Sequence, residues 1–374
     1  MKNKKDTMMI QIMVGAGSFL LAFLLQAAAR RIPGFAEWYT HHIYSLIVGI
    51  YGRICGIFSF SVVELGLYGV VIGVVWYTIT HVRQWKKVLA LLFCFVGMLV
   101  CMFTVNCGVN YYRVPFSGYL ELEVRESSKA ELAALCQELV EKVNTAAELA
   151  ESEREPADPV KNGSASAELT ETGSDLGYFG QFAVAKTGQK AMMQLGEIYE
   201  QLGGYYPRPK PVLWSWILAV QQLCGIYSPF TVEANYNWQM TGYNIPHTIC
   251  HELSHLKGFM REDEANFIGY LACIGSDDAF FRYSGYLTGW VYAGNALAGQ
   301  DWEMFVELRS QLCPQAALDL QANNDYWDRY EGKVAEVSNQ VNDSYLKFHD
   351  QEDGVKSYGR MVDLMLAYRR ENGL

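Results

Sequence analysis

The hydrophobic positions of the chain are concentrated in its first third, where long apolar runs alternate with short basic segments. Three of these runs, residues 8–29, 61–80 and 88–107, are nearly uncharged and about as long as a membrane-spanning helix, which needs roughly 20 residues. The run over 43–58 is interrupted by Arg53 and several glycines, which favours an interfacial or re-entrant helix. The pattern therefore predicts about three transmembrane helices and one interfacial segment.

Two alternatives to this membrane arrangement remain open. Ala27, Ala28 and Ala29 resemble the small-residue cleavage site of a signal peptide, so the first run could be a leader. The segment over 43–58 could be a fourth span, which would reverse the side on which the rest of the chain lies. With three spans and the N-terminus inside, six Lys and Arg lie in the inner segments and four in the outer ones. This predicts a multi-pass protein of the cell membrane whose remaining part is extracytoplasmic.

The balance of charge reverses where the apolar runs end. Up to Arg113 there are ten Lys and Arg against three Asp and Glu, whereas beyond it there are 20 against 37. The acidic second part would be repelled by nucleic-acid phosphates, which argues against nucleic-acid binding. Nine cysteines are spread thinly without a CxxC pair, so neither a cysteine zinc cluster nor a disulfide framework is predicted. The chain is thus expected to contain a membrane domain, residues 1–113, and a polar domain, residues 114–374.

The polar domain shows mostly helical periodicity. Apolar residues recur at helical spacing between Leu132 and Val143, and residues 153–177, rich in Glu, Pro, Ser, Gly and Thr, are predicted to form a flexible insertion. Residues 213–223 predict a buried or membrane-apposed helix, and the alternation over 229–237 predicts a short strand of the kind that can bind an extended peptide. Further helices are expected over 183–202, 279–298, 301–312, 325–347 and 357–368. The fold class is therefore mainly α with a short β-edge element.

The main chemical motif is an HExxH pattern made by His251, Glu252 and His255. On a helix, residues four apart lie on one face, so the two imidazoles can share one metal ion. Catalytic Zn²⁺ takes three protein ligands and a water, and Glu252 would be the general base that activates this water. His247 is one turn too far along a straight helix to reach the same ion. We therefore expect it to stabilise the site without binding the ion.

A third ligand is expected from a second helix that follows a left-handed turn at Gly258. The run Glu262-x-x-Ala265-Asn266 resembles the ExxAD pattern of gluzincin peptidases, in which the Glu is the third ligand and the last residue orients a ligand histidine. This resemblance implies that Glu262 is the ligand, with Glu264 as the alternative. Because Asn266 replaces the Asp of that pattern, its bond to the histidine would be neutral.

Hydrolysis of a peptide also needs a donor for the oxyanion that forms at the attacked carbonyl. Tyr345, Tyr358 and Arg360 are candidates, although each is more commonly a packing or capping residue. Two alternatives to catalysis stay open: an amphipathic helix with buried histidines, and a zinc site without turnover.

Several stretches together resemble one bacterial family. They are the three N-terminal spans, SPFTVEANYN, HELSHLKGFMREDEANFIGYLAC and VNDSYLKFHDQEDGVKSYGRMVDLM. The family is the domain-of-unknown-function 3810 family, membrane proteins regarded as zinc metallopeptidases. The resemblance covers nearly the whole chain outside residues 153–177, and it implies membrane attachment and a metal-binding HExxH motif.

The sequence therefore predicts a membrane-anchored, Zn²⁺-dependent metallopeptidase with a zincin-like domain, whose partners are a peptide or protein substrate and the lipid bilayer. The alternative is a non-catalytic membrane sensor or scaffold with a zinc-stabilised ectodomain. Neither the substrate nor the oligomeric state is encoded in any of these patterns.

Overall fold

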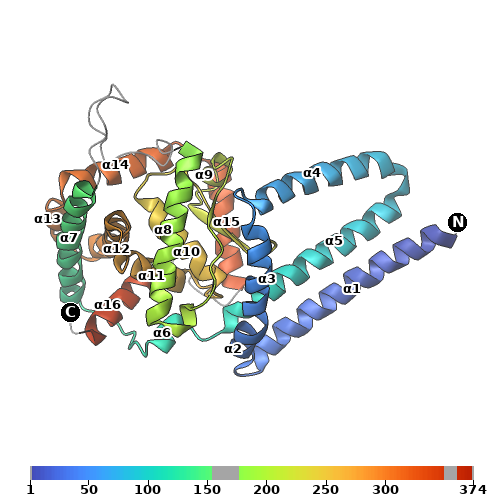
Figure 1. Ribbon diagram of the computed structural model, residues 1–374, viewed down its shortest axis with the longest axis horizontal. Coiled ribbons are helices and arrows are strands. Elements are labelled where there is room, and N and C mark those ends of the chain that lie inside the picture. The colour runs from blue at the N-terminus through green and yellow to red at the C-terminus, as the bar shows by residue number, and fades with distance from the viewer. Residues whose placement is uncertain (1, 154–176, 349–359, 373–374) are drawn as a thin grey trace. The chain divides into compact units, whose positions relative to one another are not determined.

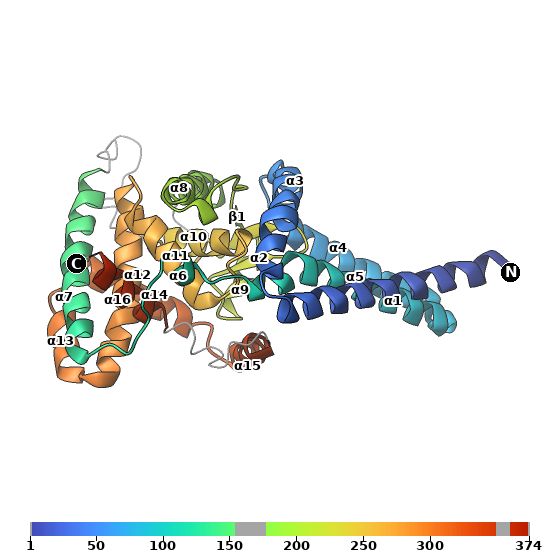
Figure 2. The same cartoon turned by 90° about the horizontal axis from the view of Figure 1, so that it is seen from below.

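The computed structural model describes residues 2–153, 177–348 and 360–372, and Figures 1 and 2 show it from two directions. The described chain is mainly helical and contains one three-stranded sheet, which confirms the predicted mainly α class. The predicted flexible insertion, residues 153–177, lies almost entirely outside the described residues.

The chain divides into two compact units. Unit 1 comprises Met1–Val114 together with Ser228–Glu233, and unit 2 comprises Pro115–Tyr227 and Ala234–Leu374. A short loop from the polar part of the chain therefore belongs to the unit formed by the apolar N-terminal helices.

The longest helices of unit 1 are α1 (Lys2–Arg31), α4 (Val62–His81) and α5 (Trp85–Asn106). Helix α1 packs along α5, and the two backbones approach closely at a pair of glycines. A Cβ on Gly97 would lie 2.7 Å from the carbonyl oxygen of Gly15, so a larger residue would force the two helices apart. Close approach of this kind is typical of helices that pack through small residues.

Shorter elements connect these long helices. Helix α2 (Phe35–Tyr39) continues through a π-helical turn, Thr40–Tyr44, into α3 (Ser45–Gly56). The predicted interfacial segment, residues 43–58, thus lies mainly on α3. Its position at a membrane surface stays a prediction.

Two helical stretches are long and apolar enough to cross a membrane. They are Thr7–Arg31 within α1 and Val62–Asn106, which contains both α4 and α5. A 3₁₀ turn, Val82–Gln84, separates these two helices, so the predicted spans over 61–80 and 88–107 correspond to successive helices. The number of spans and their orientation stay predictions, because the finding rests on length and composition alone.

The loop Ser228–Glu233, which belongs to unit 1, forms hydrogen bonds with the start of α4. The carboxylate of Glu233 accepts hydrogen bonds from the main-chain N–H groups of Val62 (3.2 Å) and Val63 (2.9 Å). A carboxylate at this position satisfies donors that have no partner within the helix and complements the positive end of the helix dipole. At the end of α5, the amide of Asn106 donates to the carbonyl oxygen of Pro229 (2.6 Å).

The core of unit 2 is built around α7 (Lys129–Ser152) and α12 (Ala279–Gln300), which lie side by side in Figure 2. The apolar side chains predicted from helical spacing, Leu132, Leu135 and Val143 among them, are buried. Three further helices pack around this pair: α10 (Asn244–Leu256), α11 (Glu262–Ile274) and α16 (Met361–Glu371).

The remaining helices of unit 2 are α6 (Phe116–Tyr119), α8 (Gly177–Ile198), α9 (Trp216–Ala219), α13 (Trp302–Arg309), α14 (Pro314–Asp328) and α15 (Lys333–Phe348). Two predictions were wrong in extent. The helix expected over 213–223 is only the single turn of α9, and the helix expected over 325–347 is divided between α14 and α15. Gly332, which has φ +153°, immediately precedes α15 and interrupts the helical backbone.

The sheet has the order β1-β3-β2. Strand β1 (Lys210–Pro211) runs parallel to β3 (Glu233–Tyr236), with Lys210 opposite Asn235, and β2 (Gly225–Ser228) lies at the other edge. The strand predicted over 229–237 is therefore β3, which begins four residues later than expected. The first part of that range is the loop that belongs to unit 1.

Candidate metal centre

Helix α10 carries the HExxH motif and is shaped by its terminal residues. Pro246 lies in the first turn, where a backbone N–H would have no partner within the helix. The helix ends at Leu256, and Gly258 adopts φ +87°, a left-handed conformation that glycine tolerates. The N–H of Gly258 donates to the carbonyl of His255 (2.8 Å), which closes the turn. The left-handed turn predicted at this glycine is thus observed.

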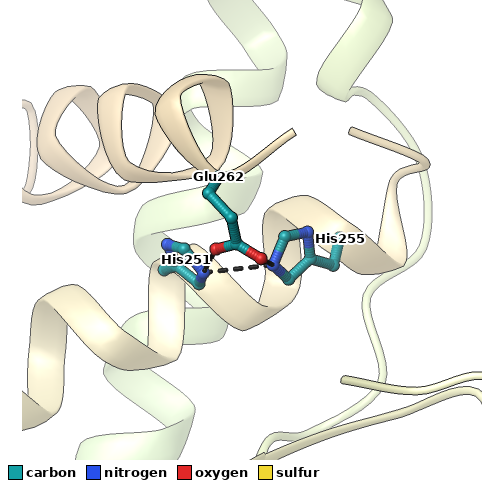
Figure 3. A group of neighbouring side chains, drawn as sticks. All are labelled: His251, His255 and Glu262. Carbon is teal, nitrogen blue, oxygen red and sulfur yellow. Dashed lines mark hydrogen bonds and ion pairs between the residues drawn. The ribbon is translucent and has the colours of Figure 1, made fainter. Parts of the chain in front are cut away.

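Helix α11 starts four residues after this turn and brings a carboxylate back to the two histidines (Figure 3). The Nε2 atoms of His251 and His255 lie 3.0 Å apart. The Glu262 carboxylate lies 3.2 Å from His251 Nε2 and 3.8 Å from His255 Nε2. These separations are shorter than twice a zinc–ligand bond of about 2.0–2.2 Å, so one ion can contact all three residues.

The hydrogen bonds made by Nδ1 of the two imidazoles fix their tautomers. His251 Nδ1 donates to the side-chain oxygen of Asn266 (2.8 Å), and His255 Nδ1 donates to the carbonyl oxygen of Phe259 (2.8 Å). With the protons on Nδ1, both Nε2 lone pairs face each other and the Glu262 carboxylate. A cation between these atoms would relieve the repulsion, so the donor set fits a metal ion.

Without an ion, the two histidines differ in their affinity for protons. Burial lowers the pKa of both, and it brings the pKa of His255 to about 4. At His251 the hydrogen bond and charge of Glu262 outweigh burial, so its pKa is raised above 6.5. A metal ion would therefore compete mainly with a proton on His251.

Glu252 lies beside these residues with a buried carboxylate. Its Oε2 atom makes no hydrogen bond within the described part of the chain, whereas the main-chain N–H of Tyr227 on β2 donates to the carboxylate. Burial raises the pKa of Glu252 to about 8, with a further contribution from the charge of Glu262. A buried carboxylate with one unsatisfied oxygen is the kind of group that transfers protons in a catalytic site.

Gly225, also on β2, allows this close packing. A Cβ at this position would lie 2.5 Å from Glu252 Oε1 and 2.9 Å from the carbonyl oxygen of Asn235. The backbone of the edge strand therefore lies directly against the carboxylate. Gly225 and Tyr227 were not predicted as site residues. No sequence pattern links strand β2 to helix α10, because strand β3 lies between them in the chain.

His247 does not join the metal-binding group. Its Nε2 lies 3.1 Å from the main-chain oxygen of Asn266, and burial lowers its pKa to about 3. Asn266 therefore contacts two of the three histidines of α10, His251 through its side chain and His247 through its backbone. His247 stabilises the position of Asn266 and, through it, the orientation of His251.

Glu264, the alternative third ligand, faces away from this group. Its carboxylate accepts hydrogen bonds from the main-chain N–H (3.0 Å) and the hydroxyl (2.6 Å) of Ser117. These bonds connect α11 to α6, and they occupy both carboxylate oxygens. The geometry favours Glu262 as the third ligand.

Of the three predicted oxyanion donors, Tyr345 lies on α15 and Tyr358 lies outside the described residues. Arg360 pairs with Asp263, at 3.5 Å between Nε and Oδ2. Their role at the metal-binding group stays a prediction. Tyr292 on α12 was not predicted as a site residue. Its pKa is raised by burial, then by the charge of Cys224, and then by the charge of Glu262 in the metal-binding group. No pattern in the sequence points to this tyrosine.

Comparison with known proteins identifies a family but no characterised relative. The family model described as "Protein of unknown function (DUF3810)" matches residues 39–366. No curated protein and no solved structure matches the chain. The match covers most of both units and includes the whole metal-binding group. The chain therefore belongs to the DUF3810 family.

Proposed function

We propose that this protein is a membrane-anchored, zinc-dependent metallopeptidase. The observation that carries the proposal is the grouping of His251, His255 and Glu262, whose ligand atoms all lie within 4.8 Å of one another. The second supporting feature is Glu252, a buried carboxylate that belongs to the same helix but is not part of the ligand group.

Two imidazole nitrogens and one carboxylate suit Zn²⁺, which binds such ligands with tetrahedral geometry and leaves one position for water or substrate. Zn²⁺ bound there would lower the pKa of a water molecule and polarise a substrate carbonyl. His251 and His255 would bind through Nε2, with their orientation maintained by Asn266 and Phe259.

Glu252 would transfer the proton in this reaction. A nearby positive charge favours the ionised form of a carboxyl group, so an ion at the site would lower the pKa of Glu252 from its raised value. The carboxylate would then accept a proton from the attacking water and deliver it to the leaving amine. Its burial keeps bulk water from competing for that proton.

The position of β2 supports a peptide as the substrate. This strand is at an edge of the sheet, and the N–H of Tyr227 donates to the Glu252 carboxylate. An extended peptide can add to an edge strand through main-chain hydrogen bonds, which would place a scissile bond beside Glu252. The apolar helices of unit 1 would anchor the enzyme in the cell membrane, with unit 2 outside the cytoplasm.

The test combines metal analysis with turnover of a proteome-derived peptide mixture, read by mass spectrometry, on the purified full chain. The wild type should contain zinc in a ratio near one per chain, and His251→Ala should lose both zinc and cleavage. Glu252→Gln should retain zinc and lose cleavage. His42→Ala, at an exposed histidine of unit 1, is the matched control and should change neither.

Two outcomes would decide against the enzyme. Fully folded wild-type protein without bound metal would remove the basis of the proposal. Absence of cleavage by zinc-loaded wild type would favour the non-catalytic sensor or scaffold.

A further inference from the structure

An uncharged stretch of unit 2 exposes large apolar side chains. No charged residue occurs between Lys210 and Glu233. Within this stretch Leu213 is 47% exposed, Trp214 54% and Trp216 51%. Two half-exposed tryptophans so close in sequence are uncommon on a surface that faces only water.

Helix α8 contributes to the same surface through Tyr178. The hydroxyl of Tyr178 donates to the carbonyl oxygen of Pro211 (3.5 Å), and its ring contacts Phe179 and Trp238, with centroids 5.8 and 5.9 Å away. Phe179 is 81% exposed. We define the aromatic surface as Phe179, Leu213, Trp214 and Trp216.

The exposed charge nearest to this stretch in the sequence is positive. Although the polar part of the chain is strongly acidic, residues 211–232 contain no carboxylate, and the exposed Arg208 lies just before β1. A cation beside aromatic side chains is a common feature of segments that bind anionic membrane surfaces. Tryptophan suits this environment, because its ring enters the apolar layer while its N–H stays among the headgroups.

The same uncharged stretch ends at the candidate membrane helices. Its last part, Ser228–Glu233, belongs to unit 1, where Glu233 binds the first N–H groups of α4 and Pro229 accepts from Asn106 at the end of α5. If α4 and α5 cross the bilayer, the start of one and the end of the other lie at its surface. Only a short length of chain then connects the aromatic surface of unit 2 to the surface of the bilayer.

We propose that the aromatic surface of unit 2 docks on the headgroup region of a lipid bilayer that contains anionic lipid. The docking rests on the membrane attachment in the proposed function and is independent of peptidase activity. It would restrict the orientation of unit 2 relative to the bilayer.

The test uses the full chain labelled with 5-fluorotryptophan, in vesicles of phosphatidylcholine and phosphatidylglycerol, and observed by ¹⁹F NMR. Trp214→Phe, Trp216→Phe, Trp302→Phe and Trp76→Phe assign four resonances by their disappearance. Lipid carrying a spin label near the headgroup should broaden the Trp214 and Trp216 signals at least twofold more than the Trp302 signal. Trp302 is the matched control, because it is 64% exposed in unit 2 but is flanked by Asp301 and Glu303.

Trp76 on α4 distinguishes a failure of docking from a failure of membrane attachment. Lipid labelled deep in the acyl chain should broaden the Trp76 signal if α4 is in the bilayer. Broadening of Trp76 while Trp214 and Trp216 stay as narrow as Trp302 would overturn the docking and leave membrane attachment intact. Signals of Trp214 and Trp216 that respond only when another protein is added would also overturn it, in favour of a protein partner.

Discussion

The side-chain oxygen of Asn266 accepts a hydrogen bond from Nδ1 of His251 at 2.8 Å, and this bond joins the two helices of the candidate metal centre. It keeps Nε2 of His251 directed at Glu262, 3.2 Å away. Asn266 is itself buried, and its main-chain oxygen contacts His247. The orientation of His251 thus depends on a neutral amide in a position where a carboxylate would bond more strongly.

The first prediction concerns this amide. Asn266→Ala should weaken zinc binding by about 10–100-fold, since loss of a hydrogen-bonding partner behind a ligand histidine typically costs that much. Competition with a chromogenic chelator measures the affinity. Asn144→Ala is the matched control: its side-chain amide is hydrogen-bonded to the main-chain groups of Gln311 and Cys313, which are not part of the metal-binding group, and its removal should leave zinc affinity unchanged. Equal affinities for wild type and Asn266→Ala would show that the bond does not orient the ligand.

The second prediction distinguishes the two glutamates at the start of α11. Glu262→Gln should reduce zinc affinity by more than about 100-fold, because it removes a charged ligand rather than a supporting partner. Glu264→Gln should retain zinc but lower the free energy of unfolding by about 1–3 kcal/mol, since it weakens the bonds to Ser117. Chelator competition and thermal unfolding measure the two effects. The opposite pattern would make Glu264 the ligand.

The parts of the site that were predictable depend on residues close together in sequence. The pairing of His251 with His255 follows from helical spacing, and the turn at Gly258 follows from the conformational freedom of glycine. The return of a carboxylate towards the histidines follows from that turn, whereas the choice of Glu262 over Glu264 came from the resemblance to the ExxAD pattern. These features are set by local backbone geometry, so a single sequence was sufficient to propose them.

The remaining parts depend on tertiary packing. Ser117 bonds to Glu264, and Gly225 contacts Glu252, across long stretches of chain that have no shared pattern. The pairing of β1 with β3 is similar, because a two-residue strand that contains Pro211 has almost no signal of its own. The single turn of α9 replaced a longer predicted helix for a related reason: apolar runs of that length suit helix, strand or loop equally.

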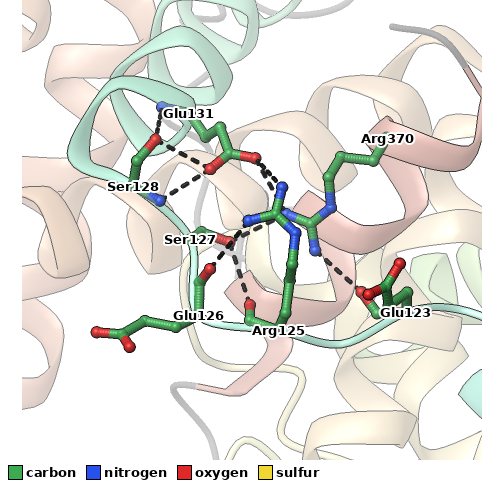
Figure 4. Close-up of polar contacts among 7 residues, drawn as sticks. All are labelled: Glu123, Arg125, Glu126, Ser127, Ser128, Glu131 and Arg370. Atoms are coloured by element: carbon green, nitrogen blue, oxygen red, sulfur yellow. Dashed lines mark hydrogen bonds and ion pairs between the residues drawn. The ribbon is translucent and has the colours of Figure 1, made fainter.

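The third prediction concerns the pH dependence of stability at the start of α7 (Figure 4). The Glu131 carboxylate accepts hydrogen bonds from the main-chain N–H and hydroxyl of Ser128, at 2.8 and 2.9 Å, and pairs with Arg125 and Arg370. The bonds from Ser128, followed by the charges of the two arginines, lower the pKa of Glu131 from 4.5 to about 2. A lowered pKa means that the ionised carboxylate stabilises the folded state.

This stabilisation should be complete above pH 4.5 and should disappear as the pH falls towards 2. Glu131→Gln should therefore have a lower Tm than wild type at pH 7, and the difference should shrink steadily below pH 4.5. Thermal unfolding in detergent from pH 7 to pH 3 measures it. Glu148→Gln, at an exposed position of the same helix, is the control and should show no such convergence. A difference between wild type and Glu131→Gln that stays constant with pH would contradict the assignment.

The last prediction concerns the contact between the edge strand β2 and Glu252, the proposed general base. In Gly225→Ala, the added Cβ would lie 2.5 Å from Glu252 Oε1 and 2.9 Å from the carbonyl oxygen of Asn235, so either the carboxylate or the strand must move. A displaced base should lower kcat/KM by about 100-fold, the size of effect that a shift of about 1 Å can cause. Zinc content should be unchanged, because none of the three ligands is contacted.

Gly299→Ala is the control for this prediction. An added Cβ there meets nothing within 4 Å, so this variant should behave as wild type. Turnover of Gly225→Ala equal to that of wild type would show that the backbone of β2 does not fix the position of Glu252.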